Sequence, residues 1–246
     1  MTKIHSLISY YARNITKFLN SPWREFKVSL NDCCNMFGSS FGDKGWHHLV
    51  ETYKQIEKDP SLPVEKTILY IYHNKFQPHG ISDCLPPHSV KFTPAWGLYP
   101  WGSFKYGTTT PATNQDRTRF CGPSSLSLIT DEFNRMKFLY HKLKKEGYRP
   151  WSFGNNHISG IILETNDNRR RMLIIHGNHR LAALSALGCK SLPIRLFKGG
   201  RHYLREKNVK KWHFVTTGQC SIEDAHKIFR LYFTENGDHI KRIIGL

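Results

Sequence analysis

The fold of this chain is decided by residues 171–188, which read RMLIIHGNHRLAALSALG. Residues 172–175 form a short apolar run rich in β-formers, typical of a buried strand. Gly177 gives the backbone the freedom that a sharp turn needs. The run that follows is rich in strong helix formers, with Asn178 as the expected N-cap and Gly188 as the expected end. The segment therefore predicts a strand, a tight turn and a helix.

Polar side chains gather where this predicted helix begins: His176, Asn178, His179 and Arg180. The free backbone N–H groups of a helix N-terminus and the positive end of its dipole make this place an anion site. An arginine fixed within the first turn would complete a cradle for phosphate. We therefore expect a phosphate group to be held by Gly177, Asn178, His179 and Arg180.

The composition is that of a folded, strongly basic protein. Of the 246 residues, 39% are hydrophobic and 13% aromatic, and 36 Lys and Arg against 19 Asp and Glu give a net charge of +17. This balance favours polyanionic partners such as nucleic acid, nucleotide phosphates, an acidic membrane surface or an acidic polymer, although a generally basic protein would show it too. No apolar run approaches the roughly 20 residues that cross a bilayer, so we expect no membrane span.

The six cysteines show no CxxC pair and no Cys/His spacing typical of zinc. Cys33 and Cys34 are adjacent, which is an unusual beginning for a set of disulfides. We therefore expect reduced thiols and a cytoplasmic protein.

Residues 1–123 are expected to form a helical region followed by a long irregular section. The helical region has apolar residues at helical spacing, and its expected elements are helices over 3–19, 25–37 and 46–58 and a buried strand over 67–73. Residues 74–123 hold seven of the twelve prolines and many aromatic side chains. So long a loop in a compact domain is normally functional or disordered, and its aromatic content argues against disorder. Two interpretations stay open: a lid over a substrate, with Trp96, Trp101 and Lys105 as contact residues, or an aromatic mini-core.

Residues 124–246 are expected to form a second region, in which helices and strands alternate around the central segment. A helix is predicted from Thr130, its N-cap, to a stop at Gly147, with Asp131 and Glu132 in its first turn. The other expected elements are strands over 158–163 and 191–197 and a helix that opens after Ser221.

The box GNHRLAA, residues 177–183, between a predicted strand and a predicted helix, resembles the signature of the ParB/sulfiredoxin-like superfamily. Members include chromosome-partitioning ParB proteins, sulfiredoxins and small free-serine kinases. The resemblance covers residues 124–197 and implies a compact α/β (α+β) domain with a mixed sheet that holds nucleotide phosphates at this helix start. The family's His-Arg pair falls on His179 and Arg180.

The box also departs from the family at three places. Sulfiredoxins carry their catalytic cysteine where Asn178 stands, so sulfinic-acid reduction is not expected. ParB proteins have Glu-Arg-Arg after the glycine, where this chain has Asn-His-Arg. The serine kinases have an acidic residue before the glycine, where this chain has His176.

The resemblance and the predicted anion site together suggest a kinase-like, nucleotide-dependent phosphotransferase that acts on a small hydroxyl compound. The implied ligands are ATP, ADP or CTP, with Mg²⁺ for phosphoryl transfer. The residues considered for catalysis are His176, Glu132 and Asp131, and the metal ligands stay open.

Two alternatives remain. The first is a nucleic-acid-binding, ParB-like protein, with or without nuclease activity, which the net charge favours. The roughly fifty residues after Phe197 offer one good helix rather than the pair of a helix-turn-helix, which argues against it. The second is a degenerate member that binds a phosphorylated ligand without turnover.

Overall fold

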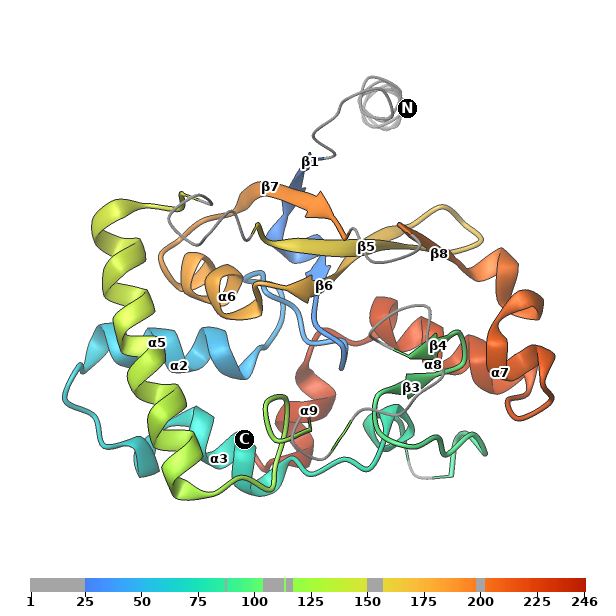
Figure 1. Cartoon of the computed structure of the whole chain (residues 1–246), viewed down its shortest axis with the longest axis horizontal. Helices are drawn as coiled ribbons and strands as arrows, with labels where there is room; N and C mark the ends of the chain where they lie inside the picture. Colours follow the sequence, from blue (N-terminus) through green and yellow to red (C-terminus); the bar gives the residue numbers. More distant parts are fainter. Residues whose placement is uncertain (1–24, 87, 104–112, 114–116, 150–156, 198–201) are drawn as a thin grey trace.

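The computed structural model describes residues 25–86, 88–103, 113, 117–149, 157–197 and 202–246 (Figure 1). These residues form a mixed α/β fold in which helices flank a mixed sheet, as expected for an α+β protein. The helix predicted over residues 3–19 lies outside the described residues, as does Lys105. No helix in the described part of the chain is long and apolar enough to cross a membrane.

The strands and α-helices are, in chain order, β1 (Glu25–Ser29), β2 (Cys33–Cys34), α2 (His48–Lys58), α3 (Ile68–Lys75), β3 (Leu98–Tyr99), β4 (Gly102–Ser103), α5 (Leu126–Glu146), β5 (Ser159–Glu164), β6 (Arg170–His176), α6 (Asn178–Ala186), β7 (Ser191–Leu196), β8 (Tyr203–Arg205), α7 (His213–Thr216), α8 (Ile222–Thr234) and α9 (Asp238–Ile243). Short 3-10 helices connect some of them, at Leu30–Asp32, Val64–Lys66, Ile81–Cys84 and Glu206–Lys211.

The described residues contain a six-stranded sheet in the order β1-β7-β5-β6-β2, with β8 paired to β5. β5 and β6 form an antiparallel hairpin whose register pairs Ile161 with Leu173. β7 runs parallel to β5, and β1 closes the edge antiparallel to β7. β2 runs parallel to β6 and pairs Cys33 with Met172. β1 and β2 lie before residue 123, whereas the other strands of this sheet lie after it. One sheet therefore contains strands from both of the regions predicted from the sequence.

Alternating side chains of β5 and β6 supply two cores on opposite faces of the sheet. Ile162, Met172 and Ile174 pack with α2, α5 and α6 on one face. Ile161, Leu163 and Leu173 pack with α8, α9 and the aromatic section on the other. Figure 1 shows α2, α5 and α6 grouped together, and β3 and β4 beside α8. Both strands are therefore buried on both faces, which explains their nearly continuous apolar runs.

The central segment is confirmed as strand, turn and helix. β6 ends at His176, Gly177 adopts a left-handed φ of 90°, and α6 begins at Asn178. The prediction that Asn178 is the N-cap was wrong: Gly177 occupies that position, and no side chain caps this end. The Asn178 side chain is consequently not used in capping. Gly188 follows α6 with a φ of 87°, as expected for a helix stop.

Two elements of the N-terminal half differ from prediction. Residues 25–37 are β1, a 3-10 helix and β2 rather than a helix, and the alternation of Phe26 and Val28 with polar residues fits their edge-strand pairing with β7. Residues 67–73, predicted as a strand, are the start of α3. Thr67 caps this helix by accepting a hydrogen bond from Tyr70 N at 3.2 Å. Burial of Leu69, Tyr72, His73 and Phe76 overrides the β propensity of the segment.

Helix α5 begins earlier than predicted. Ser125 is its N-cap and accepts a hydrogen bond from Leu128 N at 3.2 Å, whereas Thr130 lies inside the helix and its hydroxyl donates to the Leu126 carbonyl at 2.8 Å. The predicted stop at Gly147 is confirmed. Because of the extra turn, Glu132 lies well inside the helix and not at its end. Its side chain faces α6.

Candidate functional site

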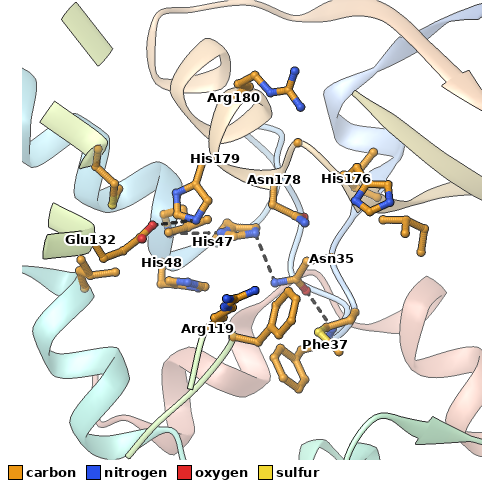
Figure 2. Close-up of a pocket in the computed structure, with 18 of the residues that line it drawn as sticks. Asn35, Phe37, His47, His48, Arg119, Glu132, His176, Asn178, His179 and Arg180 are labelled. Carbon is orange, nitrogen blue, oxygen red and sulfur yellow. Dashed lines mark hydrogen bonds and ion pairs between the residues drawn. The ribbon is translucent and has the colours of Figure 1, made fainter. Parts of the chain in front are cut away.

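A pocket of about 850 Å³ opens at the start of α6. α6 and the end of β6 form one wall, α2 and α5 form another, and the segments around Phe37 and Arg119 complete it (Figure 2). The polar and charged residues that line it are Asn35, His47, His48, His73, Thr118, Arg119, Ser124, Glu132, Arg135, His176, Asn178, His179 and Arg180. Such a volume lies in the range of sites for small molecules and cofactors.

The turn that opens the pocket requires glycine. Gly177 has a φ of 90°, and a Cβ at this position would lie 2.9 Å from Ile158 Cγ1 and 3.1 Å from Arg180 Nη2. Any side chain would therefore be strained and would also displace its neighbours. The close packing lets α6 begin directly at the end of β6 and points its free N–H groups into the pocket region.

His179 and Glu132 form an ion pair across the pocket wall. His179 Nε2 lies 2.9 Å from Glu132 Oε1, and Arg135 binds the same carboxylate with Nε and Nη2 at 3.0 and 2.6 Å. Burial opposes ionisation of Glu132, but hydrogen bonds and charge from His179 and Arg135 outweigh it and lower its pKa to about 2. Glu132 is therefore ionised at neutral pH and is a poor proton acceptor.

Four side chains of the pocket carry buried polar atoms without a hydrogen-bond partner in the described structure: His48 Nδ1, Tyr53 Oη, Asn178 Oδ1 and His179 Nδ1. Buried polar groups are nearly always paired, because an unpaired one loses its hydration without compensation. Two of the four, Asn178 and His179, are the first residues of α6. A polar ligand in the pocket would supply the hydrogen bonds that these atoms lack.

Neutral histidines form the floor of the pocket. His47 caps α2 by accepting a hydrogen bond from Leu49 N with Nδ1 at 3.2 Å, and its Nε2 lies 3.2 Å from Asn35 Nδ2. His48 stacks on Tyr72 with ring centroids 3.5 Å apart. Burial, together with the charge of His179, lowers the pKa of His47 to about 3, and burial likewise lowers the pKa of His73 to about 4. These histidines are uncharged at neutral pH.

The two arginines near α6 differ in orientation. Arg180 is buried, and its guanidinium lies beside Gly177 and points away from Asn178 and His179 (Figure 2). Arg119 is exposed and extends into the pocket from the segment opposite α6 (Figure 2).

The structure brings most of the predicted site residues to this pocket. Gly177, Asn178, His179 and Arg180 line it, as do His176, Glu132 and Trp101. Burial and the charge of Arg180 lower the pKa of His176, so its imidazole is neutral at pH 7. Asp131 is exposed on α5 and does not line the pocket.

The two described tryptophans of the predicted lid lie in different places. Trp96 is buried against Phe37, with ring centroids 5.8 Å apart, as in an aromatic mini-core. Trp101 stacks on Tyr99 at 5.1 Å, and both rings border the pocket.

Sequence reasoning missed the floor of the pocket, namely Asn35, His47, His48 and His73. The pair His47-His48 at the predicted start of a helix was the available signal. Asn35 lies in a stretch that was predicted as helix, and His73 in one predicted as a strand, so nothing placed either residue near α6. Among the described residues, no group of three His, Cys, Asp or Glu side chains is placed to hold a metal ion.

Comparisons of the chain with protein-family models, with curated proteins and with solved structures found no match.

Proposed function

We propose that this protein binds the phosphates of a nucleotide at the N-terminus of α6. The observation that carries the proposal is the unpartnered buried His179 Nδ1 at the start of a helix that opens on a pocket of about 850 Å³. A helix N-terminus favours negative charge, and its free N–H groups donate to phosphate oxygens. The resemblance of residues 177–183 to the ParB/sulfiredoxin-like signature supports the same ligand and, with it, that fold family.

His179 is the phosphate-contacting side chain in this proposal. Its Nε2 is held by Glu132 at 2.9 Å, which fixes the orientation of the ring. In the charged state, Nδ1 carries a proton and donates to a phosphate oxygen. Glu132 thus acts as a positioning residue, and its low pKa suits that role better than proton transfer.

The proposed activity is transfer of a phosphoryl group from the nucleotide to a small hydroxyl compound. His176 is a neutral imidazole in the pocket lining and accepts the hydroxyl proton. The hydroxyl oxygen then bonds to the terminal phosphorus while the bond to the bridging oxygen breaks, and the shortened nucleotide leaves with that electron pair. Trp101, whose ring stacks on Tyr99, borders the same pocket and would contact the acceptor or the base.

The described residues do not form a Mg²⁺ site of their own. Glu132 is the one carboxylate among the described pocket residues, and both its oxygens are engaged by His179 or Arg135. Mg²⁺ bound mainly by nucleotide phosphates would not need such a site. No step of the proposal is assigned to a metal.

A thermal-shift screen with ATP, ADP, CTP and GTP, each with and without Mg²⁺, tests this function. A ligand that binds only the folded state raises the melting midpoint. We expect a nucleotide-dependent rise in the wild type that is lost in His179→Ala and retained in His141→Ala, an exposed histidine on α5.

Nucleic-acid binding is the second candidate function, because the net charge of +17 favours it. If no nucleotide raises the midpoint, and DNA or RNA binds with an affinity that falls steeply with salt, the nucleotide proposal is refuted in favour of this one. If a nucleotide binds but no hydroxyl compound in a panel is phosphorylated, the protein is instead one that binds a nucleotide without turnover.

A further inference from the structure

Arg119 is a free cation inside the pocket. It makes no hydrogen bond or ion pair to another described residue, and Figure 2 shows its side chain beside His48, opposite Asn178 and His179. The pocket thus has a positive group on two facing sides, the N-terminus of α6 on one and the Arg119 guanidinium on the other.

The backbone that carries Arg119 is held in place on both sides. The Tyr72 hydroxyl donates to the Phe120 carbonyl at 2.9 Å, and the Ser124 hydroxyl donates to the Thr118 carbonyl at 3.2 Å. Phe120 N also donates to the Arg117 carbonyl at 2.9 Å. Arg119 therefore extends from an anchored segment.

No acid in the described pocket neutralises Arg119. The carboxylate of Glu132 is bound by His179 and by the fork of Arg135. The floor beside Arg119 is made of neutral groups, since burial and the neighbouring His47 and His73 hold the pKa of His48 well below its ordinary value. The exposed Arg119 guanidinium is therefore available to an anion from outside the chain.

A second, independent observation points to a ligand at the same place. His48 is 5% exposed, and its Nδ1 has no hydrogen-bond partner in the described structure. Its ring is fixed by stacking on Tyr72 and lies next to Arg119 in the pocket (Figure 2). A ligand held by Arg119 would lie within the same part of the pocket as this unpaired nitrogen.

We propose that Arg119 is a second phosphate-binding residue, and that the pocket takes two linked phosphates, one at the N-terminus of α6 and one at Arg119. This inference rests on the proposed function and deepens it: Arg119 is assigned to a second phosphate of the nucleoside di- or triphosphate. A planar guanidinium binds two oxygens of one phosphate at once, which a single imidazole does not.

Calorimetric titration of the full chain with pyrophosphate and with orthophosphate, at constant ionic strength, tests this inference. The wild type should bind pyrophosphate more tightly than orthophosphate, and Arg119→Gln should weaken pyrophosphate binding by about 10-fold or more, the effect of losing a charge-assisted pair. Orthophosphate binding should change little, and Arg119→Lys should restore part of the loss. Arg242→Gln, which removes the same charge from an exposed residue of α9, is the matched control.

The outcomes separate this inference from the proposed function. If pyrophosphate binds in a way that depends on Arg119 but no nucleotide binds, the two phosphate-binding positions are supported and the nucleotide ligand is refuted. Nucleotide binding that Arg119→Gln leaves at the level of Arg242→Gln would refute the role of Arg119 while the site at α6 stands. Equal affinity of the wild type for orthophosphate and pyrophosphate, or no binding of either, would also overturn the inference.

Discussion

Acid should destabilise this protein through the buried histidines of the pocket floor. A histidine whose pKa is lower in the folded than in the unfolded state contributes stability that is fully present above its unfolded pKa and is lost as the pH falls below it. The unfolded value is 6.5, and the folded values are about 3 for His47 and about 4 for His73. The loss therefore begins near pH 6.5 and continues until the pH reaches the folded values.

The size of the effect follows from these pKa values. At pH 5 both residues are still neutral in the folded state and mostly charged in the unfolded state. Each residue then lowers the free energy of unfolding by about 1.4 kcal/mol for each pH unit below 6.5, which is roughly 2 kcal/mol at pH 5. His47 and His73 together lower the free energy of unfolding by about 4 kcal/mol, and His48, whose pKa is also lowered, adds to this. Such a loss is a large part of the roughly 5–15 kcal/mol that stabilises a typical domain.

Urea unfolding at pH 7, 6 and 5, followed by circular dichroism, measures this loss. His47→Asn is the informative variant, because asparagine is also a good N-cap for α2 and has no titrating group in this range. We expect it to reduce the loss between pH 7 and pH 5 by about 2 kcal/mol. His141→Asn, at an exposed position of α5, should leave the loss unchanged. If His47→Asn loses as much stability as the wild type over this range, the buried neutral state of His47 is refuted.

Three further predictions concern the turn, the ion pair and the packing of the aromatic section. Gly177→Ala should lower the free energy of unfolding by about 1–3 kcal/mol in urea titrations, and by more than Gly188→Ala, because both glycines have a positive φ but only Gly177 has neighbours within 4 Å; equal losses would contradict the close packing at the turn. Glu132→Gln should weaken nucleotide binding several-fold in calorimetric titrations, since it replaces the carboxylate that holds the His179 ring by a neutral amide, whereas unchanged affinity would show that His179 does not need its partner. Asp224→Ala should cost about 1–3 kcal/mol in urea titrations, because the buried Asp224 carboxylate accepts hydrogen bonds from Lys91 N and Phe92 N at 2.8 and 3.1 Å; a cost no greater than that of Glu223→Ala, at an exposed neighbour, would refute this anchor.

The central segment could be predicted from the sequence because its signals are local. The apolar run of β6, the helix formers of α6 and the glycines at 177 and 188 act within a few residues of one another. The same holds for α2 and for β5. Only the capping residue of α6 was assigned one position too late.

Elements that depend on distant partners could not be predicted in the same way. β1 and β2 are strands because they pair with β7 and β6, more than a hundred residues later in the chain. α3 contains β-branched and aromatic residues and is a helix because Leu69, Tyr72, His73 and Phe76 are buried at helical spacing. That spacing is visible in the sequence and was outweighed by propensity.

The candidate site shows the same division. The α6 side of the pocket lies in one short segment and was found, whereas Asn35, His47 and His73 reach it only through the tertiary fold. Glu132 was among the residues considered, but its pairing with His179 depends on how α5 packs on α6. Nothing in the sequence distinguished Glu132 from its neighbour Asp131 as the residue that reaches the site.

The most direct test of the account is the location of a bound nucleotide phosphate, measured by amide NMR of the isotope-labelled full chain during titration with ADP. The account predicts that the largest saturable shifts fall on the backbone amides of residues 177–180 and on the side chains of Asn178 and His179. Saturable binding that leaves these resonances unchanged and shifts amides elsewhere in the chain would contradict it.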